Sequence, residues 1–240
     1  FKVDEGLYTD MNAIRCDDYI DNLHSIYVDQ WDWERVISKE ERNEEFLKSI
    51  VRKIVGAVAD TSNIVNMNFP ANNIRINREV KFVTTQELED AYPDKTPKER
   101  ENIITKEYGT VCIMQIGGLL KSGKKHDGRA PDYDDWSLNC DILFWLDSID
   151  SAIEISSMGI RVTPEVMKKQ LAETGDTSRL ELPFHKALMN GELPLTIGGG
   201  IGQSRLCMLL LGKKHIGEVQ ASVWPEQMIE DCAKQGIYLL

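Results

Sequence analysis

The sequence lacks a long apolar run, because the longest stretch near its C-terminus covers only residues 206–211. A helix that crosses a bilayer needs about 20 consecutive apolar residues, so we expect no membrane span. The N-terminus, Phe1-Lys2-Val3-Asp4-Glu5, carries two acids before any apolar run and does not resemble a secretory signal peptide. We therefore expect a cytoplasmic protein.

Cysteine and positive charge are also scarce. The five cysteines are scattered, with no C-x-x-C pair and no histidine at a ligand spacing, which argues against a disulfide framework and a zinc site. The 28 Lys and Arg residues against 39 Asp and Glu residues give a formal net charge of −11. Because nucleic-acid binding draws most of its affinity from Lys and Arg, we expect no nucleic-acid partner. A few arginines can still hold a small anion.

The patterns that are present indicate one globular domain over residues 1–240, with 42% hydrophobic and 28% charged residues. Ser38 and Glu41 have the spacing of a capping box. Apolar residues at four-residue spacing follow and predict a long helix: Phe46, Ile50, Ile54 and Val58. Two further helices are predicted to begin after Thr96 and Thr163, each followed by proline, and to end at Gly109 and Gly175.

Five short runs rich in β-branched and aromatic residues predict strands: residues 26–34, 80–84, 110–116, 141–146 and 152–157. The gap between the last two is too short for a helical crossover, so these two strands should pair antiparallel. We expect an α+β fold with a mainly antiparallel sheet flanked by helices.

Two of these strands carry acids on one face. Alternation places Gln30, Asp32 and Glu34 on one side of the first strand, with Asp29, Trp31 and Trp33 on the other. The acidic side is either a solvated surface or a site. In the later strand, Glu154 and Ser156 should share a face opposite Ile153 and Ile155, so Glu154 is either a surface acid or a ligand for Mg²⁺ beside phosphate oxygens.

A short loop, residues 129–136, combines Arg129 with three acids, a proline and two aromatics. A solvated acidic loop is one explanation. The other is recognition of an amino acid, with Arg129 binding a carboxylate through two hydrogen bonds and an acid binding the ammonium group.

The strongest local pattern is a glycine run, with Gly198, Gly199, Gly200 and Gly202, followed at once by an apolar helix that carries Arg205 in its first turn. Glycines let another group approach the backbone closely. The run has no Walker lysine and lacks the third glycine of a dinucleotide fingerprint. Core packing does not require an arginine at this position.

The glycine run with residues 202–206 resembles motif 3 of class II aminoacyl-tRNA synthetases. Arg15, followed after a loop by residues 28–32, resembles motif 2 of the same synthetases. Across nearly the whole chain the sequence is most similar to the ammonia-dependent asparagine synthetases, or aspartate-ammonia ligases. The matching segments, in family order, include residues 6–9, 27–35, 129–136, 154–161, 175–182, 196–205 and 219–225. We expect the chain to lack this family's N-terminal segment.

The resemblance implies a class II synthetase-like catalytic domain that makes L-asparagine from L-aspartate, ammonia and ATP through a β-aspartyl-adenylate, with Mg²⁺ and as a homodimer. It assigns catalysis to Arg15, Gln30 and Arg205. It assigns aspartate binding to Gln30, Asp32, Arg129, Asp134 and Ser157, with Asp32 or Asp134 on the ammonium group. ATP or AMP would contact Arg15, Asp141, Glu154, Gly198, Gly199, Gly200 and Arg205, and Mg²⁺ would be held by Asp141 and Glu154.

Two other readings stay open. One is an aspartyl- or asparaginyl-tRNA synthetase core, which would need an anticodon-binding module and a basic face that the sequence does not show. The other is a non-catalytic paralogue that binds an amino acid or an adenylate. The presence of Arg15, Gln30, Arg129, Glu154 and Arg205 argues against it, because a binding protein does not need groups for phosphate chemistry.

Overall fold

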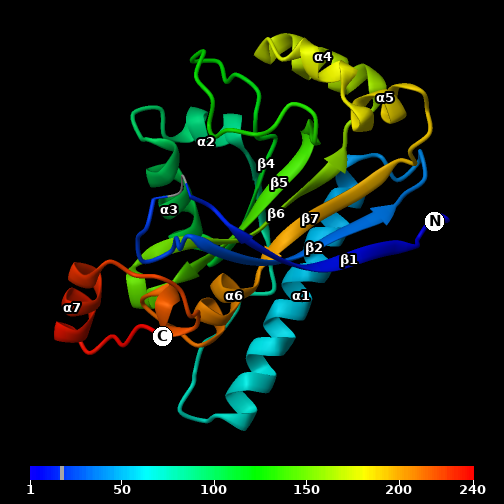
Figure 1. The fold of residues 1–240 in the computed structure, drawn as a ribbon. Coiled ribbons are helices and arrows are strands. Elements are labelled where there is room, and N and C mark those ends of the chain that lie inside the picture. Colours follow the sequence, from blue (N-terminus) through cyan, green and yellow to red (C-terminus); the bar gives the residue numbers. More distant parts are fainter. Residues whose placement is uncertain (17–18) are drawn as a thin grey trace.

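The computed structural model describes residues 1–16 and 19–240. Within these residues the strands form one sheet with the order β1-β2-β7-β6-β5-β4-β3 (Figure 1). The strands are β1 (Gly6–Ile14), β2 (Tyr27–Val36), β3 (Lys81–Thr84), β4 (Thr110–Met114), β5 (Asp134–Leu146), β6 (Ser151–Arg161) and β7 (Thr196–Gly202). Neighbouring strands pair antiparallel except for β3 and β4, which are parallel. The predicted α+β class is confirmed.

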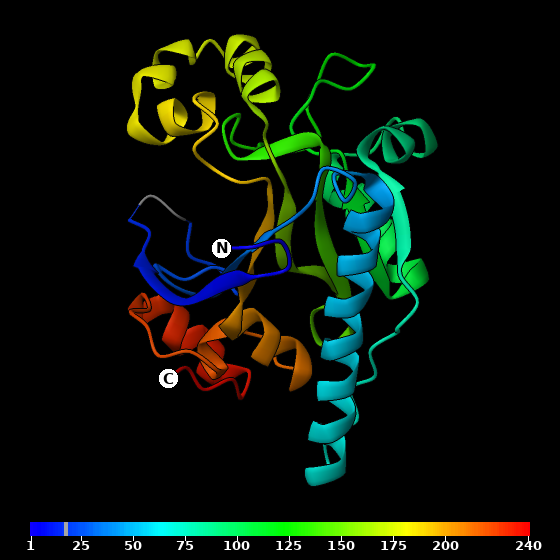
Figure 2. The ribbon, with the colours of Figure 1, turned by 90° about the vertical axis from the view of Figure 1, so that its right-hand side faces the viewer.

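The helices are α1 (Glu44–Asn68), α2 (Thr85–Ala91), α3 (Pro97–Tyr108), α4 (Pro164–Thr174), α5 (Pro183–Met189), α6 (Gln203–Leu210) and α7 (Glu226–Lys234). The long helix α1 runs along one face of the sheet, whereas α4, α5 and α7 lie on the other side (Figure 2). No helix in the described part of the chain has both the length and the hydrophobicity needed to cross a bilayer.

The main core lies between α1 and the sheet. Leu47, Val51 and Val55 of α1 pack in one cluster with Phe144 and Ile197, and each of these side chains is buried. Burying a large aliphatic or aromatic side chain contributes roughly 1.5–3 kcal/mol. With this face of the sheet occupied by the core, the opposite face of the central strands is the one open to solvent.

The start of α1 differs from the prediction. Its N-cap is Asn43, whose side chain accepts a hydrogen bond from the Phe46 amide at 2.9 Å. Ser38 and Glu41 do form the expected reciprocal bonds, with Ser38 N donating to Glu41 Oε2 at 2.8 Å, but they close a turn before the helix. The capping-box prediction for α1 is therefore wrong.

The other two predicted helices are confirmed at both ends. Thr96 caps α3 in a capping box with Glu99, and Thr163 caps α4 by accepting from the Val166 amide. Gly109 and Gly175 are the C-caps.

The β5–β6 pair forms the predicted antiparallel hairpin but contains an irregularity that reverses one expectation. Ile142 pairs with Ser156 and Leu143 pairs with Glu154, so Ile155 is an extra residue that shifts the register. A bulge of this kind changes which side chains share a face. Ser156 is buried, and Ser157 rather than Ser156 lies on the open face with Glu154. The predicted Glu154–Ser156 face is wrong for this reason.

Candidate active site

A cleft of about 450 Å³ lies on the face of the sheet opposite α1. Its floor is formed by β2, β6 and β7, and the segments before β2 and after α6 close one end. The lining residues include Arg15, Gln30, Asp32, Tyr133, Glu154, Ser157, Gly200 and Arg205. On β2, Gln30 and Asp32 line the cleft, while Trp33 packs against the core on the other face of the strand.

Each polar residue on this face of β2 lies opposite a glycine of β7. The register pairs Gln30 with Gly202, Asp32 with Gly200, and Glu34 with Gly198. A Cβ added at Gly200 would lie 2.6 Å from Asp32 Oδ1, and one at Gly198 would overlap Glu34 Oε2. The glycines therefore provide room for the side chains of β2, in addition to any room they leave for a ligand.

Arg205 is positioned by the start of α6. Asp29, on the opposite side of β2 from Asp32, accepts hydrogen bonds from Ser204 N at 3.2 Å and from Ser204 Oγ at 2.6 Å. This fixes the first turn of the helix, where backbone N–H groups have no partner within the helix. Arg205 Nη1 donates to the Glu154 carbonyl at 3.3 Å, and Arg205 lines the cleft.

Arg15 reaches the same cleft from the other side. It directly follows β1, and its amide donates to the Ile26 carbonyl at 2.8 Å, which extends the antiparallel β1–β2 pair by one residue. Arg15 therefore lies directly beside the antiparallel pair of β1 and β2. Although 190 residues separate them in the sequence, Arg15 and Arg205 line one cavity.

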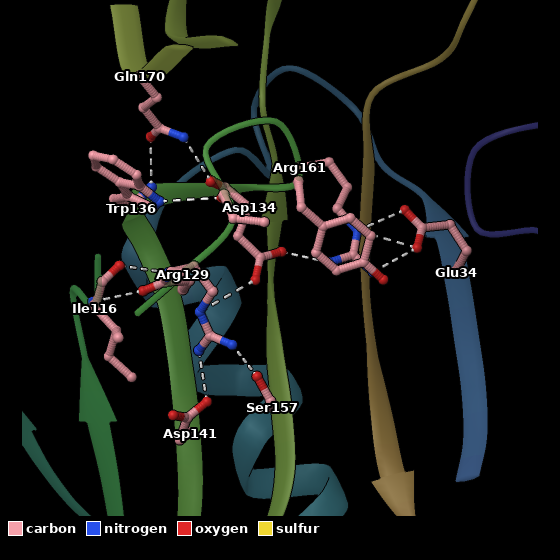
Figure 3. Close-up of polar contacts among 12 residues, drawn as sticks. Glu34, Ile116, Arg129, Asp134, Trp136, Asp141, Ser157, Arg161 and Gln170 are labelled. Carbon is pink, nitrogen blue, oxygen red and sulfur yellow. Dashed lines mark hydrogen bonds and ion pairs between the residues drawn. The ribbon is translucent and has the colours of Figure 1, made fainter. Parts of the chain in front are cut away.

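Arg129 is held beneath the cleft by a set of acceptors from β5 and β6 (Figure 3). Its Nη2 donates to Asp141 Oδ1 at 2.6 Å, its Nη1 donates to Ser157 Oγ, and its Nε lies 3.8 Å from Asp134 Oδ2. Only Ser157 of this group lines the cleft. The Ser157 hydroxyl accepts from Arg129, and its hydrogen bond to the neighbouring Asp141 carboxyl acts to lower the pKa of that group.

A second largely buried guanidinium, Arg161, joins three strands. It donates to Glu34 of β2 through Nε at 3.0 and 3.1 Å and through Nη2 at 2.8 Å, and Nη1 donates to Asp134 of β5 (Figure 3). Nη2 also donates to the Tyr133 hydroxyl at 2.9 Å, and the guanidinium carbon lies 3.8 Å from the centre of the Tyr133 ring.

The cleft thus combines two arginines, a carboxylate and an amide–carboxylate pair. Comparison of the chain with known proteins identifies its family. The family model described as "Aspartate-ammonia ligase" matches residues 1–236. The chain belongs to the aspartate-ammonia ligase family. It is 61% identical over 241 residues to the aspartate–ammonia ligase of Limosilactobacillus reuteri, covering all of this chain and 72% of that ligase. With the ligase of Clostridium tetani the identity is 60% over 240 residues, covering 70% of that protein.

Solved structures with the same fold are class II synthetases. Asparaginyl-tRNA synthetase from Entamoeba histolytica, in complex with asparaginyl-adenylate, superposes with a TM-score of 0.64 at 16% identity. The Pyrococcus horikoshii enzyme with asparaginyl-adenylate gives 0.65, also at 16%. The ligase chain is covered to 90% and 92%, and it spans about half the length of these synthetases (51% and 54%). At this identity the likeness concerns the fold, and the predicted class II synthetase-like domain is confirmed.

The structure brings most of the predicted residues of the ligase together, but not all of them reach the cleft. Arg15, Gln30, Asp32, Glu154, Ser157, Gly200 and Arg205 line it. Arg129, Asp134 and Asp141 lie below it in the ion-pair network. Gly198 faces Glu34, and Gly199 faces Met158 on the core side. For all of these residues, a direct contact with substrate remains a prediction.

Burial sets the protonation behaviour of the acids in the ligase site. Burial raises the pKa of Glu154 to about 7, and the charge of Asp141 adds to the rise while Arg205 opposes it. Burial also raises the pKa of Asp32, with Arg161 and Arg15 acting in the opposite direction. In both cases desolvation disfavours the charged form of a carboxyl group. Glu154 can therefore change charge near neutral pH.

The predicted Mg²⁺ ligands of the ligase are not equivalent. Among the described residues, no three His, Cys, Asp or Glu side chains are grouped so that they could hold a metal. Asp141 is bound to Arg129, whereas Glu154 lines the cleft. Mg²⁺ is often held by one or two carboxylates together with substrate phosphates. Glu154 fits such a site, and Asp141 does not without loss of its ion pair.

Sequence reasoning missed Arg161 and Asp29 as parts of the site. Arg161 is the last residue of β6 and lies seven residues after Glu154, on the same open face. The sequence contains this spacing, but it does not show that Glu34 of β2 and Asp134 of β5 meet at Arg161. Asp29 was grouped with the apolar side of its strand, and its role in fixing α6 depends on a contact 175 residues away.

Proposed function

We propose that this chain catalyses the ATP-dependent amidation of L-aspartate by ammonia, giving L-asparagine, AMP and pyrophosphate through a β-aspartyl-adenylate. The relatives named aspartate–ammonia ligase, at about 60% identity over the whole chain, support this activity. The structural observation that carries the proposal is the convergence of Arg15, Arg205 and Glu154 on the cleft that also holds Gln30 and Asp32. A phosphate-binding end and an amino-acid-binding end thereby share one cavity.

The first step is attack of the aspartate β-carboxylate on the α-phosphorus of ATP, with pyrophosphate as the leaving group. Negative charge develops on the α-phosphate oxygens, and preorganised cations are the effective catalysts of such a step. Arg15 and Arg205 provide this charge. Holding both substrates in one cavity supplies the alignment that the attack requires.

Aspartate recognition belongs to the other end of the cleft. Asp32 binds the α-ammonium group, because its carboxylate lies in the cleft, whereas Asp134 is buried under Arg161 and Arg129. Gln30 adds an amide for hydrogen bonding. Arg129 acts through Ser157, which it holds in the lining of the cleft.

In the second step, ammonia attacks the activated β-carbonyl carbon, the bond from that carbon to the phosphate oxygen breaks, and AMP leaves. Asparagine differs from aspartate only in its side-chain amide. The site must therefore hold aspartate in the orientation that activates the β-carboxylate and not the α-carboxylate. Anchoring the α-ammonium group at Asp32 orients the substrate in this way.

Glu154 is the residue that would hold Mg²⁺ together with phosphate oxygens of ATP, and the ion would neutralise phosphate charge there. We also propose a cytoplasmic homodimer. The edge strand β1 exposes Leu7, Tyr8 and Ile14, which a second copy would cover. Light scattering on the purified full-length protein tests the oligomeric state.

A tRNA synthetase core shares the fold, but the likeness to those enzymes is limited to 16% identity. A non-catalytic paralogue would not need Arg15 and Arg205 in one cleft.

The deciding experiment measures aspartate-dependent ATP turnover with and without ammonium chloride while AMP, pyrophosphate and asparagine are followed together. Asparagine formed in equal amounts with AMP, and only with ammonium present, is the expected result. Absence of AMP under every condition would contradict the proposed function and favour the binding protein.

A further inference from the structure

A second cavity, of about 290 Å³, adjoins the cleft. It is lined by Glu34, Tyr133, Arg161, Val162, Phe184, Leu188, Leu193, Pro194 and Thr196, and we name it the vestibule. Tyr133 is the residue that the two linings share. None of the groups assigned to aspartate or ATP lines the vestibule.

The vestibule lies at the aspartate end of the site. Glu34 follows Asp32 by two residues on the same face of β2, and a rise of about 3.4 Å per residue puts their Cα atoms about 7 Å apart. Arg15 and Arg205 lie at the other end, beside the start of β2 and of α6. A small molecule in the vestibule would therefore approach the site from the side away from the triphosphate.

The polar floor of the vestibule is the ion pair between Glu34 and Arg161, with the Tyr133 hydroxyl beside it. Asp134 lies behind this pair and contacts Arg161. The Asp134 side chain is 1% exposed, but that of Glu34 is 31% exposed. Glu34 accepts three hydrogen bonds, all from Arg161, and a carboxylate has about four acceptor positions. The open position favours a small cation.

The walls of the vestibule are apolar, with Phe184 and Leu188 from α5 facing Leu193 and Pro194. Apolar surroundings disfavour the charged form of an amine and so promote loss of its proton. A carboxylate at the floor of an apolar chamber can thus both attract a protonated amine and accept its proton.

We propose that the vestibule binds ammonium and delivers ammonia to the adenylate. The ammonium cation binds at the Glu34 carboxylate and transfers one proton to it, leaving NH₃, and Glu34 then releases that proton to water. NH₃ passes Tyr133 into the cleft and forms the C–N bond as the bond to AMP breaks, and the amide nitrogen loses one further proton. This assignment rests on the proposed function.

Blocking the vestibule tests the path. Leu193→Trp adds bulk to the wall, and Leu182→Trp adds the same bulk outside it. Both leucines are exposed (37% and 50%), so neither change disturbs the core. In the full-length enzyme, L193W should lower kcat/KM for ammonium about tenfold or more. Aspartate-dependent pyrophosphate–ATP exchange without ammonium should stay within about twofold of wild type. L182W should match wild type in both assays.

The two assays separate the proposals. No exchange in the wild-type enzyme would overturn the proposed function. Normal exchange with an unchanged ammonium response in L193W would overturn the vestibule alone. Equal losses in both assays would also overturn it, because the wall would then shape adenylation.

A second variant tests the proton transfer. Hydroxylamine is largely neutral at neutral pH and needs no deprotonation before attack. In Glu34→Gln, which keeps an oxygen acceptor for Arg161, kcat/KM for ammonium should fall about tenfold. Hydroxamate formation should stay within about threefold of wild type. If both nucleophiles lose rate equally, Glu34 only supports Arg161, and its role as proton acceptor is refuted.

Discussion

The arginines at the two ends of the site have opposite surroundings. At the phosphate end, Arg205 lines the cleft, and the bond from its Nη1 goes to a backbone carbonyl rather than to a carboxylate. At the other end, Arg129 and Arg161 are largely buried, and each forms ion pairs with carboxylates. Buried charges are tolerated only when they are paired, whereas a cation that acts on a transition state must keep its charge for the substrate. The same residue type thus stabilises the structure at one end, and we propose that it acts on the substrate at the other.

The sharpest test of this contrast removes a buried partner. Arg161→Leu leaves Glu34 without a cation and leaves Asp134 with Arg129 alone, at 3.8 Å. Loss of one partner from a buried ion pair costs roughly 3–5 kcal/mol of unfolding free energy. Denaturant titration measures it. Arg78→Leu, which removes a surface pair with Asp60, should cost about 1 kcal/mol or less. Similar losses in the two variants would show that burial does not strengthen the dependence of the fold on the Arg161 ion pairs.

The complementary change is made at the phosphate end. Arg205→Ala should lower the rate of adenylate formation about 10²- to 10³-fold, because one charge donor to the developing negative charge is lost. Pyrophosphate–ATP exchange with aspartate reports this step. The midpoint of denaturation should shift much less than in R161L, and a large shift would show that Arg205 also has a structural role.

A smaller effect is expected where β7 borders the buried network. Gly198→Ala places a methyl group against Glu34 Oε2 and 2.6 Å from Arg161 Nη2. Overpacking of this kind costs about 1–3 kcal/mol. Gly128→Ala is the control, since its added carbon meets nothing within 4 Å. Equal denaturation midpoints in the two variants would contradict the close packing at Gly198.

The weakest effect concerns Glu154, which lies between the two ends. Its pKa is about 7 in the folded protein against an ordinary value of 4.5. Between these values the folded state holds a proton that the unfolded state has lost. Glu154 therefore lowers stability as the pH rises from about 4.5 to about 7. Denaturation midpoints across this range, without ligands, should fall more steeply for wild type than for Glu154→Gln. Parallel curves would contradict the raised pKa.

Much of the fold follows from local sequence patterns, because caps, strand runs and short hairpin gaps act over a few residues. The predicted ends of α3 and α4 and the β5–β6 hairpin are examples. The errors arose where one sequence pattern is compatible with two different local structures. Ser38 and Glu41 satisfy the capping pattern in a turn, while Asn43 caps the helix. The bulge at Ile155 leaves no mark in the alternation of side chains.

The candidate site was predictable where one continuous segment of sequence contains all the residues of a feature, as with Arg205, which follows the glycine run at the start of its helix. It was not predictable where separate segments meet. The Arg161 network needs the register of β2 against β7 and the approach of Asp134 from β5. These contacts are set by tertiary packing, and no window of the sequence contains them.

The pairing of polar residues on β2 with glycines on β7 has a consequence for how the family can change. A longer side chain at position 198 or 200 is harmful while Glu34 and Asp32 keep their length, but a shorter residue on β2 would make the same change harmless. The two strands should therefore be epistatic. Among related ligases we expect departures from glycine at these positions to coincide with replacement of the residue directly across the ladder. The two positions of each pair should then vary together rather than independently.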